Sequence, residues 1–350
     1  MKKIAFFDSK KYDIESFEAA EHEGLKFKFF EHKLTADTAA LAKGYDGACA
    51  FVNDTVDAQT IDTLCAEGVK ILAMRCAGYN NIDFKEAFGK LHVVRVPAYS
   101  PYAVAEHAAA LLLTLNRKTH KAYSRTRDFN FSIAGLTGFD LHGKTCGVIG
   151  TGKIGRIFID ICKGFGMNVV AYDPYPAKDT DINYVPLDAL FAQSDVISLH
   201  CPLAESTHHI VNAASIEKMK PGVILLNTSR GALIDSEALL HGLKDGRIGG
   251  AGLDVYEEES SVFFEDFSGS VIQDDVLALL VSMPNVLVTS HQAFLTKEAL
   301  HNIAETTIAN LRAFFDGSAL DNEICYHCAN GSISEKTCPK ALTGECFPRG

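Results

Sequence analysis

The stretch CGVIGTGKIG, residues 146–155, is the feature that most narrows what this chain can fold into. Its glycines Gly150, Gly152 and Gly155 have G-x-G-x-x-G spacing and stand between an apolar strand-like run and a segment with helical periodicity. The first glycine permits a tight turn, the second lets backbone approach a pyrophosphate, and the third lets helix and strand pack closely. The helix N-terminus then favours the phosphate charge. The stretch predicts a dinucleotide site on a parallel sheet.

An acidic residue follows at the end of the next predicted strand, NVVAYD, where Asp173 stands. A carboxylate at this place accepts hydrogen bonds from ribose hydroxyls and repels a 2′-phosphate. The alternative is a surface aspartate at a strand end, but strand, glycines, helix and acid all occur in the expected order. Asp173 therefore predicts NAD rather than NADP as the cofactor.

Strands and helices alternate along most of the chain, which predicts an α/β fold of two doubly wound parallel-sheet domains. PAYSPY (97–102) marks one crossing between the domains, and the helix predicted at 299–315 packs back on the first domain, so the chain crosses twice. The expected domains are a flavodoxin-like substrate domain, a Rossmann NAD-binding domain and a cysteine-containing tail. Their predicted bounds are 1–101 with 292–325, then 102–291, and finally 326–350.

Composition excludes some classes of partner. The 33 basic and 44 acidic residues give a formal charge of −11, which argues against a nucleic-acid backbone. No apolar run has the length of a membrane span, and the apolar run at the start is too short for a signal peptide, so we expect a cytoplasmic protein. The apolar helix predicted at 103–115 must be buried between domains or subunits, which suggests a homodimer or homotetramer.

Three polar residues follow later strands of the second series, where open α/β sheets bind ligands. Arg230 follows VILLNTS, Glu259 follows GLDVYEE, and His291 follows VLVTS. Arginine can bind a substrate carboxylate with two hydrogen bonds, and histidine can give a proton to a carbonyl oxygen as hydride arrives. A carboxylate beside the histidine holds the ring and favours its protonated form. The three residues predict a dehydrogenase of small 2-oxo or 2-hydroxy acids.

The motifs together resemble the D-isomer-specific 2-hydroxyacid dehydrogenases, and most closely the fermentative D-lactate branch. The resemblance runs from about residue 1 to Cys325 and rests on GTGKIG, NTSRGALID, GLDVYEEE and SHQAF. RCAGYNNID (75–83) and FFEDFSGSVIQDD (263–275) are typical of the branch. It implies that Arg230, Glu259 and His291 are catalytic and that pyruvate is reduced to D-lactate. Two alternatives remain: a broader reductase of phenylpyruvate or 2-oxoisocaproate, and a non-enzymatic dinucleotide-sensing corepressor.

The resemblance also implies further contacts. The implied substrate contacts are Arg75, Ala77, Gly78, Tyr99 and Arg230. Besides the three glycines and Asp173, the implied cofactor contacts are Lys153, Ile154, Cys201, Pro202, Thr207, Thr228, Ser229 and Asp254. From the residues alone, Asp254 is equally explained as a strand-end cap and Tyr99 as packing at the domain crossing.

The tail contains Cys325, Cys328, Cys338 and Cys346. The first pair has C-x-x-C spacing, which is typical of zinc ligands, but the second pair is more widely spaced and the segment has little apolar periodicity. We therefore expect a flexible or lightly packed tail rather than a metal site, and no metal elsewhere.

Overall fold

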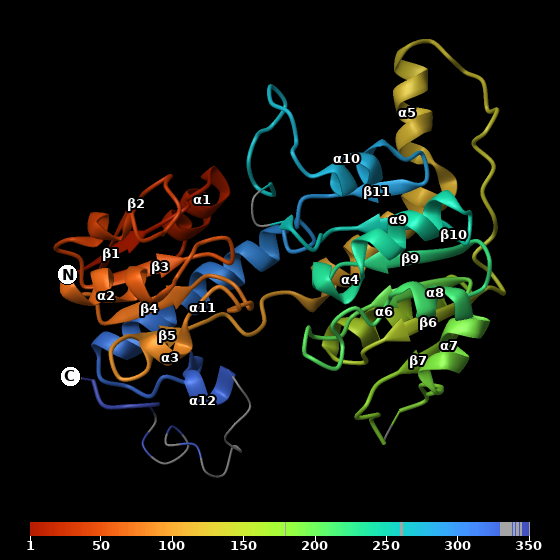
Figure 1. The fold of residues 1–350 in the computed structure, drawn as a ribbon. Coiled ribbons are helices and arrows are strands. Elements are labelled where there is room, and N and C mark those ends of the chain that lie inside the picture. The colour runs from red at the N-terminus through yellow and green to blue at the C-terminus, as the bar shows by residue number, and fades with distance from the viewer. Residues whose placement is uncertain are drawn as a thin grey trace. The chain divides into compact units, whose positions relative to one another are not determined.

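The computed structural model describes residues 1–178, 180–259, 262–329, 338, 340, 343 and 345–349. The chain forms two compact units (Figure 1). Unit 1 comprises Met1–Ser100 and Thr296–Gly350, and unit 2 comprises Pro101–Leu295. The first boundary falls inside the segment PAYSPY. The described residues of the tail belong to unit 1 instead of standing apart from it.

Unit 1 contains a six-stranded sheet with the order β12-β5-β4-β3-β1-β2. The order of the first five strands, 2-1-3-4-5, is that of flavodoxin-like folds, as expected. Only β12 is antiparallel to its neighbour. The strands are β1 (Lys2–Phe6), β2 (Leu25–Phe29), β3 (Gly47–Ala50), β4 (Ile71–Met74), β5 (His92–Val94) and β12 (Glu323–Ile324).

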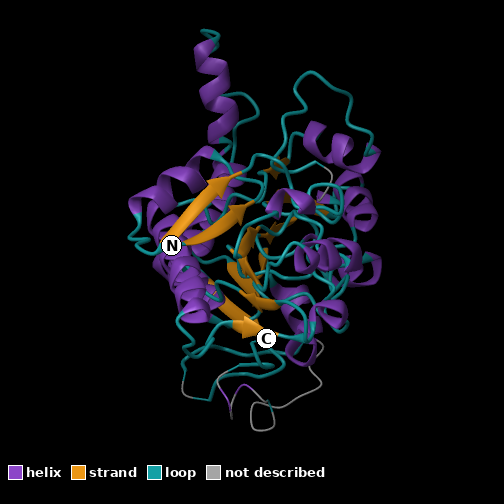
Figure 2. Cartoon of the chain, turned by 90° about the vertical axis from the view of Figure 1, so that its left-hand side faces the viewer, coloured by secondary structure: helices purple, strands orange, loops and turns teal. Residues whose placement is uncertain are grey.

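Helices flank this sheet, as the view in Figure 2 shows. The long helix α11 (Lys297–Phe315) returns from unit 2 and packs on α1 and β4, which confirms the predicted helix at 299–315. It begins two residues earlier than expected because the Thr296 side chain accepts a hydrogen bond from the backbone N–H of Ala299. The other helices are α1 (Lys11–Ala19), η1 (Ala39–Ala42), α2 (Ala58–Ala66), α3 (Phe84–Ala87) and α12 (Tyr326–Ala329).

Unit 2 contains a second six-stranded sheet, ordered β11-β10-β9-β8-β6-β7, in which every pair of neighbours is parallel. A parallel bridge from Ala171 to Tyr184 adds a further position beside β7. The result is the doubly wound Rossmann order, whose direction reverses between β6 and β8. The strands are β6 (Thr145–Ile149), β7 (Asn168–Tyr172), β8 (Val196–Leu199), β9 (Val223–Asn227), β10 (Ile248–Leu253) and β11 (Val286–Val288).

The helix α4 (Pro101–Arg117) packs on α6, β9 and β10 within unit 2. Its burial therefore needs no second subunit. None of the described helices is long and apolar enough to cross a membrane. The others are α5 (Thr119–Arg127), α6 (Lys153–Gly164), α7 (Leu187–Gln193), α8 (Ala213–Lys218), η2 (Gly231–Leu233), α9 (Ser236–Lys244) and α10 (Asp275–Ser282).

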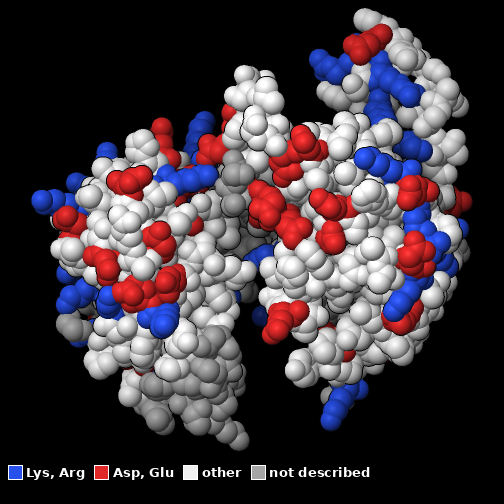
Figure 3. All heavy atoms as spheres, viewed as in Figure 1, with Lys and Arg blue, Asp and Glu red and all other residues white. Residues whose placement is uncertain are grey.

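Burial explains why these segments are strands. All residues of β8 and β9 are buried, as expected for central strands covered on both faces. The edge strand β2 alternates between more and less exposed residues. The β10 and β11 ladders end at Leu253 and Val288, before the polar residues that follow. On the face shown in Figure 3, Lys and Arg side chains are interspersed with Asp and Glu.

Candidate active site

The glycine loop of unit 2 joins β6 to α6. Gly150 has a φ of +94°, in the left-handed region that favours glycine, and its N–H donates to the Tyr172 carbonyl at 2.8 Å. A Cβ on Gly155 would collide with the carbonyl oxygen of Gly150. The Cα of Gly152, in contrast, faces open space at the N-terminus of α6. The three glycines thus have the three roles that a pyrophosphate cradle requires.

Asp173 follows β7 beside this loop. Its carboxylate accepts hydrogen bonds at 2.8 Å from both the N–H and the hydroxyl of Thr151, and at 2.9 Å from the N–H of Tyr175. Burial opposes ionisation, but the backbone hydrogen bonds from Thr151 and Tyr175 outweigh it and lower the pKa of Asp173. The group is a fixed carboxylate with oxygen lone pairs left over for ribose hydroxyls.

The segment after β8 lies directly against the glycine loop, since a Cβ on Gly150 would approach the Cys201 N–H to 2.6 Å. Burial lowers the pKa of the neighbouring His200 to about 3, so this imidazole is neutral. Thr207 closes the segment by donating its hydroxyl to the Pro202 carbonyl at 2.7 Å. Lys153 and Ile154 begin α6, where the first helical N–H groups are exposed to a phosphate.

Asn227, the last residue of β9, shapes the turn that carries Arg230. Its side-chain oxygen accepts from the Ser229 N–H at 3.0 Å, and its amide donates to the Arg230 carbonyl at 2.8 Å. Ser229 in turn donates its hydroxyl to the Leu199 carbonyl of β8. Thr228 is buried, and its hydroxyl has no partner among the described residues. Asn227 was not among the predicted site residues, although it begins the motif NTSRG.

Asp254 follows β10 and is fully buried. Its carboxylate accepts hydrogen bonds from the Thr289 hydroxyl at 2.6 Å and from the N–H groups of Gln292 and Ala293 at 2.9 and 2.8 Å. Asp254 therefore braces the segment that carries His291, and the predicted cofactor contact stays a prediction. His107 of α4, which is partly buried, lies 3.3 Å from the same carboxylate and 3.1 Å from the Thr289 hydroxyl.

Glu259 and His291 form a direct pair. His291 Nδ1 lies 2.7 Å from Glu259 Oε1, and the other oxygen of Glu259 accepts from the Tyr256 N–H at 2.9 Å. Each side chain is less than one-fifth exposed. His291 has a φ of +51°, and its N–H donates to the Asp254 carbonyl. Because Glu259 engages Nδ1, the second ring nitrogen, Nε2, is the one that a reacting oxygen can use.

Arg230, Asp254 and His291 follow β9, β10 and β11, which are neighbours in the sheet. Glu259 comes from the same loop as Asp254. Because parallel strands end at one edge of a sheet, unit 2 presents a fixed cation and a carboxylate–imidazole pair at the edge that also carries the glycine loop. Arg230 is only partly buried, and one of its nitrogens donates to the Ser229 carbonyl.

Arg75 of unit 1 has a different place from the one predicted. It is 1% exposed, lies between the rings of Phe6 and Phe51, and pairs with Asp13 at 3.2 Å. Its remaining nitrogens donate to the carbonyls of Phe7 and Asp8. The guanidinium is thus committed to the interior of unit 1. This placement is a correction: the Arg75 side chain has a structural role and leaves the set of proposed substrate contacts.

For the loop after Arg75, substrate contact by Ala77 and Gly78 stays a proposal. Arg95 donates to the Ala77 carbonyl at 2.9 Å, and Cys76 donates to that of Gly78 at 3.3 Å. Within the part of the chain that the structure describes, the N–H groups of Ala77 and Gly78 have no acceptor. The Tyr99 carbonyl accepts from Asn302, and its side chain is partly buried.

Comparison with known proteins places this arrangement in a family. Residues 109–293 match the model of the D-isomer specific 2-hydroxyacid dehydrogenase NAD binding domain. The chain is 52% identical to D-lactate dehydrogenase of Escherichia coli over 328 residues, which covers 92% of this chain and 99% of that protein. The chain belongs to the D-isomer-specific 2-hydroxyacid dehydrogenase family. It is therefore an enzyme of the NAD-dependent dehydrogenase class, as the sequence motifs predicted.

Solved structures agree in fold. The apo structure of D-lactate dehydrogenase from Escherichia coli matches with a TM-score of 0.85 at 48% identity, covering 92% of this chain and 99% of that one. The pyruvate reductase of Chlamydomonas reinhardtii matches with a TM-score of 0.88 at 44% identity, covering 92% of this chain and 98% of that one. Both the α/β class and the parallel sheets are confirmed.

The buried Arg75–Asp13 pair makes a stability prediction. Arg75→Met removes the cation and leaves Asp13 buried without its charge partner, so the free energy of unfolding should fall by about 3–5 kcal/mol. Urea denaturation followed by circular dichroism measures this. Lys90→Met, which breaks exposed pairs with Asp62 and Glu86, is the control and should change stability by less than about 1 kcal/mol. An Arg75→Met enzyme of normal stability with a greatly raised KM would return Arg75 to the substrate site.

Proposed function

We propose that this protein is an NAD-dependent D-lactate dehydrogenase that interconverts pyruvate and D-lactate. The observation that carries the proposal is the Glu259–His291 pair at the sheet edge that also carries Arg230 and the glycine loop. The family membership and the names of the similar proteins support the same activity. A corepressor that only senses a dinucleotide would need the cradle but not a paired acid–base histidine.

The chain's own residues divide the reaction between them. Arg230 binds the carboxylate of the 2-oxo acid, for which a planar guanidinium offers two parallel hydrogen bonds. His291 donates the proton on Nε2 to the carbonyl oxygen, which becomes the hydroxyl, while the carbonyl carbon receives a hydride. A bound nicotinamide supplies that hydride. Glu259 stabilises the imidazolium before transfer, and in the oxidation direction His291 takes the proton back.

The cradle fits NAD. Gly150, Gly152 and Gly155 leave room for a pyrophosphate at the start of α6, where Lys153 and Ile154 stand. Asp173 would hold the adenine ribose through its hydroxyls, and its ionised form disfavours a 2′-phosphate. Thr228, whose buried hydroxyl has no partner among the described residues, offers a hydrogen bond beside the turn that carries Ser229 and Arg230. We keep Cys201, Pro202, Thr207 and Asp254 as proposed neighbours of the cofactor.

Pyruvate is the proposed substrate because bulky side chains stand close to the reacting histidine. The ring of Phe264 is 6.0 Å from that of His291, and Phe294, three residues further on, is buried. A small oxo acid needs little space beside such rings. A broader reductase of phenylpyruvate or 2-oxoisocaproate would use the same catalytic groups with a larger pocket, and an aromatic lining can also attract such apolar chains.

We also infer that the enzyme is a homodimer or homotetramer. The helix α5 and the segment after it extend away from the rest of unit 2 (Figure 1). This arm (residues 119–139) exposes Phe129, Phe131 and Ile133 by 84%, 73% and 82%. Apolar side chains gathered on a projecting segment mark a protein interface, and a second copy is the partner that closed symmetry favours.

Light scattering after gel filtration tests the interface. The wild-type enzyme should have a mass that is a multiple of the 38.0 kDa chain. The double variant Phe131→Asp with Ile133→Asp should run as a monomer, because the charges cannot be buried in an apolar interface. Val271→Asp, at another exposed apolar residue, is the control and should keep the wild-type mass. A monomeric wild-type protein would contradict the inference.

We propose a cytoplasmic location. All ten cysteines are free in the structure, and eight of the ten are buried. Reduced thiols are the normal state in the cytosol.

The Glu259–His291 pair makes a kinetic prediction. Glu259→Gln removes the charged partner of His291 Nδ1, so the ring loses the group that holds and stabilises it and kcat for pyruvate reduction should fall with little change in KM. Steady-state kinetics with pyruvate measure both constants. Arg230→Lys is the contrasting variant: it should raise KM for the oxo acid as well as lower kcat, because lysine keeps the charge but not the fork. An unchanged kcat in Glu259→Gln would remove Glu259 from the proton transfer.

A further inference from the structure

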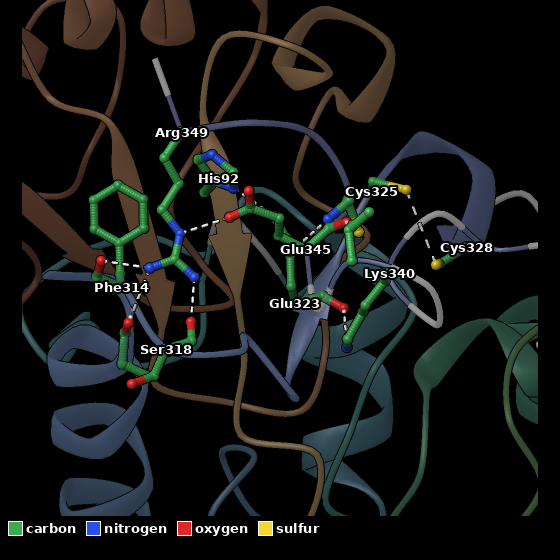
Figure 4. A network of polar contacts seen from close by, with 12 residues as sticks. His92, Phe314, Ser318, Glu323, Cys325, Cys328, Lys340, Glu345 and Arg349 are labelled. Atoms are coloured by element: carbon green, nitrogen blue, oxygen red, sulfur yellow. Dashed lines mark hydrogen bonds and ion pairs between the residues drawn. The ribbon is translucent and has the colours of Figure 1, made fainter. Parts of the chain in front are cut away.

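Two neighbouring cysteines, Cys325 and Cys328, meet the more distant Cys346 in unit 1. Cys325 follows β12, Cys328 lies in α12, and Cys346 lies in the last described segment. Their sulfur atoms all lie within 4.8 Å of one another. The Cys325 and Cys328 sulfurs are 4.0 Å apart (Figure 4). Cys325 and Cys346 are each 3% exposed.

Contacts independent of the sulfurs hold Cys346 in place. Its N–H donates to Glu323 Oε2 at 2.6 Å, and the other oxygen of Glu323 pairs with His92 Nδ1 at 2.6 Å. Phe347 stacks on the His92 ring with centroids 4.0 Å apart. Because Glu323 is in β12, two residues before Cys325, one buried carboxylate brings both ends of the cluster together.

A second set of contacts fixes the end of the tail. Arg349 donates to the carbonyls of Ala313 and Phe314 at 3.0 and 2.6 Å and pairs with Glu345 at 2.7 Å (Figure 4). Lys340 donates to the Glu323 carbonyl at 3.2 Å. For the described residues of the tail, the expectation of a flexible or lightly packed segment is therefore wrong. That expectation relied on the wide spacing of the later cysteines in the sequence. The fold nevertheless brings Cys346 close to Cys325 and Cys328.

We propose that Cys325, Cys328 and Cys346 bind a zinc ion that fastens the C-terminal tail to unit 1. Zinc–thiolate bonds of about 2.3 Å in tetrahedral geometry place sulfurs about 3.8 Å apart, close to the separation of the Cys325 and Cys328 sulfurs. A disulfide needs sulfurs at about 2.05 Å. A ligand set of thiols alone selects a soft or borderline metal such as zinc over magnesium or calcium. Binding displaces the three thiol protons to solvent, with no change in oxidation state.

The fourth ligand of a tetrahedral site comes from outside this group of three. Cys338, the remaining cysteine of the tail, is buried but its sulfur is not part of this group, so we leave the fourth position to a water molecule. The site has a structural role, since its ligands belong to unit 1 and the proposed catalytic residues to unit 2. Loss of the metal should therefore lower the melting temperature of the protein, while kcat for pyruvate reduction should stay close to that of the metal-bound enzyme.

Metal analysis of the full-length enzyme tests the proposal. Protein purified under reducing conditions with zinc in the medium should contain about one zinc per chain by mass spectrometry of its metals. Cys346→Ser should contain little, and Cys65→Ser, which removes a cysteine from α2, should keep the full content. Circular dichroism and pyruvate reduction show whether each variant is folded.

A second measurement uses the unmodified chain, so that a misfolded variant cannot decide the result. Cobalt added to metal-free wild-type protein should give the visible and near-ultraviolet bands of tetrahedral cobalt–thiolate coordination, and zinc should displace them. No stoichiometric metal and no cobalt–thiolate bands would overturn the site. An intact mass lower by two hydrogens under non-reducing conditions, with a Cys325–Cys328 disulfide located by peptide mapping, would also overturn it.

Discussion

The candidate active site depends on one fully buried carboxylate. Asp254 accepts hydrogen bonds from the side chain of Thr289 and from two backbone N–H groups just after His291. These bonds tie the end of β11 to the end of β10 and hold His291 in its left-handed conformation. Without that brace, the imidazole would have no fixed direction, and its pairing with Glu259 would cost the entropy of ordering a loop.

The parallel sheet supplies the remaining order. β9, β10 and β11 are neighbours, so the groups that follow them share an edge although they are distant in the sequence. The Asn227 side chain fixes the turn at Arg230 by its hydrogen bond to the Arg230 carbonyl. The backbone of Tyr256 packs so closely against Gly231 that a side chain at Gly231 would not fit. The polar groups are thus set by backbone contacts before any substrate binds, which is the condition for electrostatic preorganisation.

Most candidate residues of this site were proposed from local patterns, and tertiary contacts account for what those patterns missed. The glycine loop and Asp173 could be predicted because their roles follow from one strand–turn–helix unit. The sequence analysis assigned Arg75 to the substrate site because an arginine after a strand gives the same pattern whichever way its side chain points. Here the side chain points inward and pairs with Asp13, which comes from the distant helix α1. The bracing role of Asp254 and the approach of Cys346 to Cys325 depend on segments that only the fold brings together.

The most direct test of the account is NADH oxidation by the purified protein with pyruvate, phenylpyruvate and 2-oxoisocaproate in parallel, with the chirality of the product assayed. The account predicts the highest kcat/KM for pyruvate and D-lactate as the product. A preference for either larger acid would contradict the substrate assignment while leaving the roles of Arg230, Glu259 and His291 intact. No turnover with any of the three acids, by protein that still binds NADH, would contradict the central claim.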